Sequence, residues 1–531
     1  MGEASDRRLA ALLSVALFAG VAWPLAFVAV PPLQDLPGHL ATVSVLQHLD
    51  RYPEYAATGP WRTNAALSTF CLLAGRFVDL VTAGKLFVLG VLAAGAFALP
   101  RFVLCFGGRR RMLVASLAAW PMVHNWFVAM GMLDFALSIP CAMALLVGLD
   151  RQRSSPSLGR AARAAVMAVV TWYVHVFALL VVGLMVLAHV ASASRGSRAG
   201  ALREARVLVP ALVPAGLLAA SSVAMHLATV GTAAGGATEA TAYSSLAWQL
   251  YDLWAHWLYG FTPRSASTLV AAAVLVVWMV RGWRSGPALL GPWPTTAVLV
   301  AYALSPSVAF DWGYMGSRFV PFVWLAALVR APERVTRAGA AVLGAAALAY
   351  WVGNGVDVLR LDREMRELTA GTTAVPDGAR VAFLVFSTRG ASRNTWSLAT
   401  AVGMYAVERH TSAPNLWANS ASQPLVRRTP PERWEDPVLV RRFLDAARDR
   451  TTFCVVRADL GLDPASCDTA WRQEWAAYWA DVGRGATRVL MWDPTPDALG
   501  EVPETWEPAL HQGRLWVFTQ RRSDEVRARF H

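Results

Sequence analysis

The segment LAALLSVALFAGVAWPLAFVAVPPLQDLPGH, residues 9–39, contains the two features that decide the fold. Its first part, Leu9 to Val30, is almost entirely apolar. It is long enough to cross the hydrocarbon core of a bilayer, which is about 30 Å thick and takes roughly 20 helical residues. Its second part brings two ionisable side chains, Asp35 and His39, directly after this apolar run. The segment therefore predicts a membrane-spanning helix that ends in a polar loop at the membrane surface.

The composition of the whole chain is typical of a polytopic membrane protein. Of its 531 residues, 55% are hydrophobic, and the mean hydropathy of +0.39 is higher than that of soluble domains. The net charge is +12, but the basic residues lie mostly in short loops between apolar segments. This is the positive-inside pattern of membrane proteins. The lipid bilayer is therefore the expected partner, and the charge does not favour nucleic acid.

The positions of the arginines predict the orientation of the chain and the number of its spans. Arg7 and Arg8 place the N-terminus in the cytoplasm. The later arginine clusters fall on the same side if two segments of the first outer loop, starting at Asp35 and at Asn64, lie on the membrane surface. We then expect about 11 spans and an extracytoplasmic C-terminus. The expected spans are residues 9–30, 83–106, 112–128, 132–148, 164–178, 179–194, 207–228, 266–282, 287–304, 319–331 and 338–354.

From about residue 375 the pattern changes to that of a soluble α/β domain. Strand-like runs cover residues 380–386, 451–460, 488–493 and 514–520, and helical stretches cover 437–449 and 470–482. We therefore predict a mainly α fold with two domains: a transmembrane helix bundle, residues 1–370, and an extracytoplasmic α/β domain, residues 371–531. Cys454 and Cys467 can form a disulfide if this domain lies outside the cytoplasm.

The order of these parts resembles the GT-C superfamily of integral membrane glycosyltransferases, which use polyprenyl-phosphate sugars. Four segments also look like a group of bacterial membrane proteins classed loosely with that superfamily. They are DLPGHLATVSVL (35–46), GMLDFALSIP (131–140), WYVHVFA (172–178) and GSRFVPF (316–322). The resemblance implies an enzyme of the bacterial cytoplasmic membrane that moves a sugar from a polyprenyl-phosphate donor to an acceptor on the outer face. The acceptor, a glycan, lipid or protein, is left open.

By this resemblance the carboxylate of the first loop, Asp35, is the base or orienting group for the acceptor hydroxyl. The reaction needs such a group because the donor phosphate already leaves well, whereas the acceptor must lose a proton. Asp35 followed by Leu-Pro is also a good helix start, so N-capping is an alternative that is compatible with catalysis. His39 lies one turn later on the same helix face. It orients the carboxylate or contacts a phosphate, or it is a hydrogen-bonded histidine at the interface.

Four further residues complete the expected binding site. Arg318 begins a span on the outer side, where the charge rule disfavours it, and it suits a lipid phosphate. Snorkelling is the alternative, with Asp311 of the same loop as a neutralising group. By resemblance Asp134 contacts the donor or a divalent metal as cofactor, and the alternative is a cap at the start of its own span. His124 and His175 lie near the outer ends of neighbouring spans, where each either lines the same cavity or packs as a hydrogen-bonded histidine.

Two other classes of function stay open from the sequence. A transporter or flippase of lipid or polysaccharide usually has internal repeats and ionisable residues at mid-membrane, whereas the ionisable residues here gather at the outer rim. A non-catalytic envelope-assembly protein would not depend on Asp35 at all.

Aromatic residues crowd the outer loop 229–265. Trp248, Trp254, Trp257 and Tyr259 fit an interfacial aromatic belt. The alternative is that they stack on a sugar or cover a polyprenyl chain.

Overall fold

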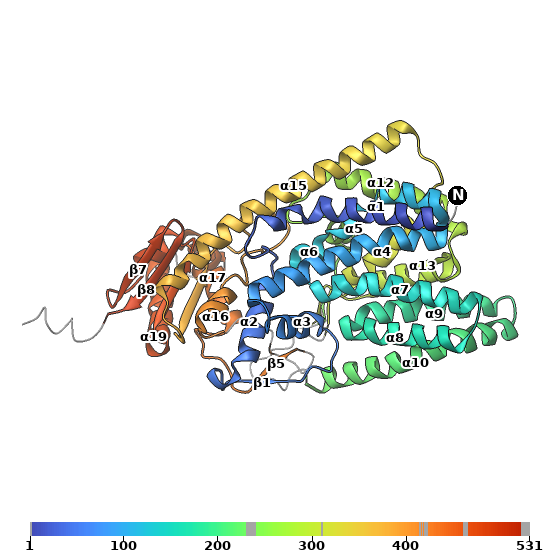
Figure 1. Ribbon diagram of the computed structural model, residues 1–531. Coiled ribbons are helices and arrows are strands. Elements are labelled where there is room, and N and C mark those ends of the chain that lie inside the picture. Colours follow the sequence, from blue (N-terminus) through green and yellow to red (C-terminus); the bar gives the residue numbers. More distant parts are fainter. Residues whose placement is uncertain are drawn as a thin grey trace, which may run out of the picture.

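The computed structural model describes residues 3–229, 241–309, 312–413, 416, 418, 423–459 and 466–521. It is mainly helical, as predicted, with 68% of residues in helices. Among the described residues, six helices are long and apolar enough to cross a membrane. They are α1 (Glu3–Ala22), α4 (Leu80–Ser116), α7 (Leu133–Ser154), α9 (Val176–Ser194), α10 (Arg198–Thr229) and α15 (Arg337–Thr369). The helices form an elongated bundle with the N-terminus at one end and a small sheet at the other (Figure 1).

Shorter helices occupy most of the other segments for which spans are predicted. They are α8 (Leu158–Val174), α12 (Ser265–Arg281), α13 (Pro292–Leu304) and α14 (Val320–Leu328), and α11 (Leu246–Leu258) lies in the preceding loop. Short 3-10 helices link several of these elements: η1 (Trp23–Ala26), η2 (Leu49–Arg51), η3 (Trp283–Ser285), η4 (Ala288–Leu290), η5 (Gly316–Phe319) and η6 (Ala370–Ala374). The total of about 11 spans stays a prediction.

The predicted span 112–128 is not one helix. The backbone of Gly108 is non-helical, with φ of 75°, and interrupts α4 there. Helix α4 then ends at Ser116, inside the predicted span, and the chain continues as two short helices, α5 (Trp120–Val123) and α6 (Trp126–Met130). The break between them has a local cause, because the side chain of Asn125 accepts a hydrogen bond from Val128 N at 3.2 Å and so starts a new helix.

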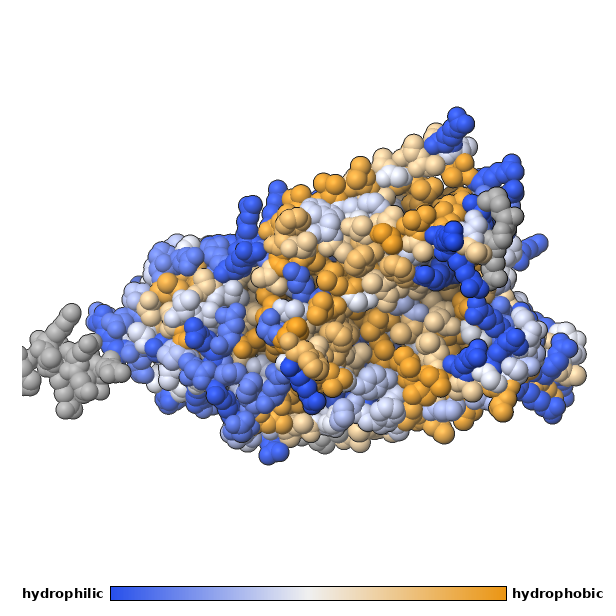
Figure 2. Space-filling model, in the orientation of Figure 1, coloured by the Kyte–Doolittle hydropathy of each residue, from blue (hydrophilic) through white to orange (hydrophobic). Residues whose placement is uncertain are grey.

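The surface of the bundle carries a broad apolar band between two polar ends (Figure 2). Large apolar side chains of the long helices are exposed, for example Leu12 of α1 at 68% and Leu217 of α10 at 69%. At the N-terminal end, Arg109 pairs with Asp6 at 3.3 Å. We call this end, with the arginines 109–111, the arginine end, and the opposite end the sheet end. Apolar exposure on this scale is expected where lipid covers a protein.

The C-terminal part contains a sheet with the strand order β4-β6-β8-β7. Strands β4 (Val381–Val385) and β6 (Arg488–Trp492) are parallel, whereas β8 (Leu515–Gln520) is antiparallel to both β6 and β7 (Trp506–Gln512). The accompanying helices are α16 (Gly403–Arg409), α17 (Pro437–Ala447), α18 (Arg450–Asp459), α19 (Cys467–Gly485) and α20 (Pro496–Gly500). Two short antiparallel pairs complete the strands: β1 (Tyr55–Ala57) with β5 (Leu425–Arg427), and β2 (Val308–Ala309) with β3 (Trp312–Gly313).

One predicted strand is wrong. Residues 451–460 were expected to be extended, but residues up to Asp459 belong to helix α18. The side chain of Asp449 accepts from Thr452 N at 2.7 Å and starts the helix. Cys454 then forms a disulfide with Cys467 of α19, with a Cα–Cα distance of 5.6 Å. Capping and packing on a neighbouring helix thus outweigh the β propensity of Thr, Phe and Val in this segment.

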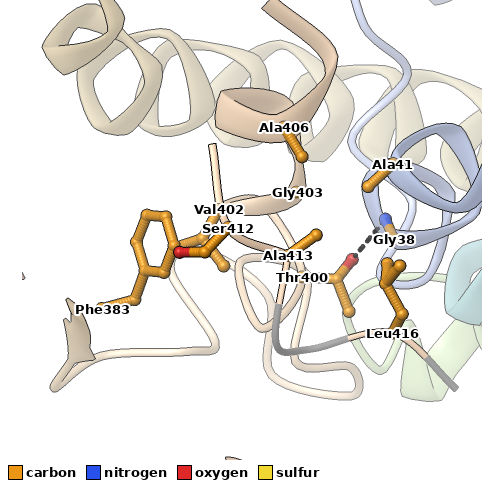
Figure 3. A pocket seen from close by; sticks show the side chains of 10 residues that line it. All are labelled: Gly38, Ala41, Phe383, Thr400, Val402, Gly403, Ala406, Ser412, Ala413 and Leu416. Atoms are coloured by element: carbon orange, nitrogen blue, oxygen red, sulfur yellow. Dashed lines mark hydrogen bonds between the residues drawn. The ribbon is translucent and has the colours of Figure 1, made fainter. Parts of the chain in front are cut away.

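The first outer loop contains the two expected helices, α2 (Leu36–Gln47) and α3 (Ala66–Ala74). However, α2 does not lie with one open face on a membrane surface, because even its polar residues Thr42 and Ser44 are buried. The segment 400–413 covers it. Figure 3 shows Thr400, Gly403 and Ala406 facing Gly38 and Ala41, with an apolar cavity of only about 10 Å³ between them. The C-terminal part and the first loop are therefore packed together, and the division at residue 370 stays a prediction.

Candidate functional site

The four segments that carried the resemblance meet at one cavity near the sheet end. Its volume is about 170 Å³. Five of the six predicted site residues line it: Asp35, His39, Asp134, His175 and Arg318. The sequence separates these residues by up to 283 positions (318 − 35), so only the fold brings them together.

Asp35 is positioned by its backbone. Gln34 N donates to the carbonyl of Ala129 at 3.1 Å, and Asp35 N donates to that of Met130 at 3.0 Å. Both acceptors belong to the end of α6, which terminates at Gly131 with φ of 80°. A Cβ at Gly131 would lie 2.7 Å from Asp35 N, so only glycine allows this approach. The loop before α2 is thereby docked beside the turn that leads to Asp134.

The carboxylate of Asp35 does not cap α2. Asp35 precedes Leu36 at the N-cap position, but its side chain accepts no hydrogen bond from the helix backbone. Instead, Asp35 Oδ1 accepts from Gln34 Nε2 at 3.2 Å, and Gln34 Oε1 in turn accepts from Trp396 N at 2.8 Å. Burial raises the pKa of Asp35 to about 7, although the Gln34 hydrogen bond acts in the opposite direction. A carboxyl group with this pKa can hold and release a proton near neutral pH.

His39 lies one turn further along α2 and lines the same cavity. Burial lowers its pKa to about 4, so the imidazole is neutral at physiological pH. A neutral imidazole has one donor and one acceptor nitrogen. Such a ring can hydrogen-bond to a hydroxyl group or to an anionic oxygen without adding charge to the site.

The segment around the start of α3 forms hydrogen bonds with the α8–α9 turn and with the beginning of α7, both at the sheet end of the bundle. Thr63 Oγ1 donates to the carbonyl of Trp172 at 2.8 Å and accepts from Val176 N at 2.7 Å, which fixes the turn around His175. Four residues later, Leu67 N donates to Asp134 Oδ1 at 2.8 Å. Asp134 therefore caps α3, a helix other than its own. The alternative role, a cap at the start of its own span, is not seen, because no side chain in the described part of the chain caps the N-terminus of α7. Asp134 instead combines the cap on α3 with a position in the cavity wall.

His175 lies in the turn between α8 and α9. Its Nδ1 atom accepts from Phe177 N at 3.2 Å and caps α9. Because Nδ1 is used as an acceptor, the proton of the neutral ring is on Nε2. His175 therefore combines a cap with a position on the cavity wall.

Arg318 is the cation of the cavity. Its guanidinium lies 5.9 Å from the ring centroids of both Phe135 and Phe177. No carboxylate of the described residues lies within ion-pair distance of Arg318, and its buried Nε atom has no hydrogen-bond partner there. Asp311, the alternative neutralising group, lies outside the described residues. A buried guanidinium that lies between aromatic rings and has no counter-ion in the described part of the chain is expected to attract an anion.

His124 is the one predicted site residue that does not line the cavity. It follows α5, its carbonyl accepts from Tyr350 Oη at 2.9 Å, and its ring lies 5.6 Å from that of Phe261. Because the chain changes direction between α5 and α6, the buried side chain of His124 lies in the interior of the bundle. Sequence reasoning missed two polar lining residues, Asn64 and Gln423. Asn64 has a φ of 57°, but a lone asparagine in a loop gives no signal of this.

The described residues contain no group of three His, Cys, Asp or Glu side chains arranged to hold a metal ion. Comparison of the chain with models of known protein families and with curated proteins finds no match. The site is therefore interpreted from its own geometry and chemistry.

Proposed function

We propose that the protein is a glycosyltransferase of the bacterial cytoplasmic membrane, with the sheet end extracytoplasmic. It transfers a sugar from a polyprenyl-phosphate donor to a hydroxyl of an acceptor. The observation that carries the proposal is that one cavity contains both a carboxylate with a raised pKa that does not cap its helix, Asp35, and a guanidinium, Arg318, that has no counter-ion among the described residues. The disulfide between Cys454 and Cys467 supports an extracytoplasmic location of the C-terminal part, since disulfides persist in oxidising compartments.

In this reaction the acceptor oxygen attacks the anomeric carbon of the donor sugar as the bond from that carbon to the phosphate oxygen breaks. The acceptor hydroxyl gives its proton to the Asp35 carboxylate. The phosphate leaves on the polyprenyl chain with an additional negative charge, which the Arg318 guanidinium neutralises. The neutral imidazole of His39 hydrogen-bonds to the acceptor or to a phosphate oxygen. Attack opposite to the leaving phosphate inverts the anomeric configuration.

The test uses the full chain in phospholipid nanodiscs, with radiolabelled polyprenyl-phosphate hexoses and pentoses as donors and membrane extract as acceptor. Release of polyprenyl phosphate and transfer of label are both measured. The expected result is transfer from at least one donor, with a loss of about a thousand-fold in Asp35→Asn. The control is Asp50→Asn, which removes an exposed carboxylate from the same outer loop.

Two results would overturn the proposal. If no donor loses its sugar, or if Asp35→Asn transfers as fast as the unchanged protein, the site does not carry out sugar transfer. Movement of an intact lipid-linked sugar across a vesicle membrane without cleavage would instead favour the flippase alternative.

A further inference from the structure

A second cavity lies behind the first. Its volume is about 390 Å³, and it is lined by residues of α11, of α13 and of the segment 313–317. Ser317 lines this cavity, whereas the next residue, Arg318, lines the first one. Consecutive residues of one segment therefore line the two cavities.

The base of the second cavity contains a buried carboxylate. Asp252 is only 6% exposed. Its Oδ1 atom lies 2.9 Å from His256 Nδ1, which is within ion-pair distance when the imidazole is protonated. This oxygen has no hydrogen-bond partner among the described residues. Its Oδ2 atom accepts only a long hydrogen bond, of 3.4 Å, from Ser317 Oγ. A buried acceptor without a donor costs free energy, so the geometry favours a ligand that brings donors.

His256 is held in place beside this carboxylate. Its ring stacks on that of Trp126 with 4.0 Å between centroids and 17° between planes, and its Nδ1 atom is 3.0 Å from Ser317 Oγ. The Asp252 carboxylate therefore lies beside an imidazole whose position is fixed by its packing on Trp126 and its contact with Ser317.

The rim of the second cavity offers a flat aromatic surface. The indole of Trp248 is 50% exposed and lies 5.2 Å from the ring of Tyr251. The other polar groups of the lining are hydroxyls and amides, and no arginine or lysine is among the lining residues that the structure describes. The cavity therefore lacks the cation that a phosphate needs. A few hydrogen-bonding groups beside an aromatic face are typical of sites for neutral, orientable ligands.

We propose that this second cavity binds a neutral sugar ring. The apolar face of the ring lies on Trp248, and one or two of its hydroxyls donate to Asp252 Oδ1. This assignment rests on the proposed function in one respect, since the ring is taken to belong to the acceptor. The acceptor is then a glycan or glycoconjugate, because the donor phosphate is held at Arg318 in the first cavity.

The experiment measures binding and does not require turnover. The full chain is placed in phosphatidylcholine nanodiscs, because maltoside detergents would themselves occupy a sugar site. Methyl β-D-glucopyranoside, methyl β-D-galactopyranoside and methyl α-D-mannopyranoside are titrated, and tryptophan fluorescence and saturation-transfer NMR are recorded. We expect saturable binding of at least one glycoside, weakened about ten-fold or more by Trp248→Ala and by Asp252→Asn. The matched control is Trp61→Ala, which removes another exposed indole.

Trp248→Ala keeps the test decisive even if a change at buried Asp252 disturbs folding, because half of the indole is already exposed. The proposal is overturned if no glycoside binds, if Trp248→Ala binds as tightly as the unchanged protein, or if butylammonium displaces the glycoside, which would indicate a cation site. Glycoside binding without any sugar transfer would support the sugar site in the second cavity and contradict the proposed function. Asp35-dependent sugar transfer with an acceptor KM that Trp248→Ala does not alter would support the proposed function and contradict the sugar site.

Discussion

Asp35 and Arg318 share a cavity without forming an ion pair with each other. Each is held by something other than an opposite charge: Asp35 by backbone hydrogen bonds to the end of α6, and Arg318 by two phenylalanine rings. A base and a cation kept apart in this way leave room for a substrate between them. The cost is the desolvation of two charged groups, and this cost has measurable consequences.

The first consequence concerns the pH dependence of activity. The pKa of Asp35 is about 7 because the group is buried, and a base acts only when it is deprotonated. The transfer rate is therefore expected to rise about ten-fold per pH unit below pH of about 7 and to level off above it. The measurement is kcat/KM from about pH 5 to about pH 9. A profile that is flat through this range would exclude Asp35 as the base.

The second consequence concerns stability. The folded-state pKa of about 7 lies above the ordinary value of 3.8. The folded protein therefore holds a proton that the unfolded chain has lost, and stability falls as the pH rises from about 4 to about 7. Asp35→Asn removes this loss. Because the two pKa values differ by about 3 and each pKa unit is worth ~1.4 kcal/mol, the substitution is expected to stabilise the protein by about 4 kcal/mol at about pH 8, with little effect at about pH 4. Thermal unfolding followed by tryptophan fluorescence measures it, and Asp50→Asn should show no such difference.

A third consequence concerns Arg318. Replacement by lysine keeps the charge but removes the planar fork that matches a phosphate. Arg318→Lys is expected to raise the KM for the donor about ten-fold, and Arg318→Ala about a hundred-fold. Steady-state rates against donor concentration give these values. Arg51→Lys, at an exposed arginine paired with Asp377 at 2.8 Å, is the control, and an equal effect there would contradict a specific role for Arg318.

Part of the site could be predicted at this scale, and part could not. Arg318 stood out because it lies where the charge rule disfavours a cation, and Asp35 because it follows an apolar run. His124 and His175 look alike in the sequence, since each ends a short apolar segment. Only the contact of Thr63 with Trp172 and Val176 turns the chain around His175 toward the cavity. Gln423 comes from the C-terminal part, and nothing in its local sequence marks it.

At the scale of elements, the site is assembled by turns at the sheet end of the bundle. The α6–α7 turn at Gly131 carries Asp134, and the α8–α9 turn carries His175. The first loop crosses both and binds them through backbone and threonine hydrogen bonds. Helix period and charge predicted where most helices lie. They did not predict the break of the span 112–128, since its apolar composition is that of a continuous helix, nor the helix at 450–459, which depends on contacts with α19.

Gly131 gives a prediction at this scale. Gly131→Ala introduces both a strained positive φ and a Cβ at 2.7 Å from Asp35 N. Gly59→Ala is the matched control, because its φ of 93° imposes similar strain while a Cβ there meets nothing within 4 Å. Each is expected to lose about 1 kcal/mol from backbone strain, and Gly131→Ala a further ~2 kcal/mol from the clash. Thermal unfolding and transfer rates check this, and equal behaviour of both variants would show that the docking of Asp35 on α6 is unimportant.

At the scale of the whole molecule, the proposal depends on which end of the bundle faces the cytoplasm. The arginine end carries Arg109 paired with Asp6 and Arg110 paired with Glu333 at 3.7 Å. The helices of the first loop, α2 and α3, and the sheet lie at the other end (Figure 1). The cavity is lined by Asp35 and His39 of that loop. The positive-inside rule then predicts an extracytoplasmic sheet end.

Labelling of introduced cysteines tests this orientation. In a background with exposed Cys105 replaced by serine, Asp50→Cys is expected to react with a membrane-impermeant maleimide in intact spheroplasts, and Glu333→Cys only after permeabilisation. Mass shift on a gel gives the extent of labelling. The reverse pattern would place the cavity in the cytoplasm and contradict a donor on the outer face.

Helix α15 connects the two ends without interruption. Its 33 residues make it about 50 Å long, and no proline lies within it. It begins among the arginines and ends beside the sheet, and it is both a core helix of the bundle and the stalk of the C-terminal part. The sheet is consequently joined to the bundle by a continuous helix, so that its distance from the arginine end is set by a count of helical turns. An insertion of two residues near Leu361 would rotate the sheet by roughly half a turn relative to the cavity.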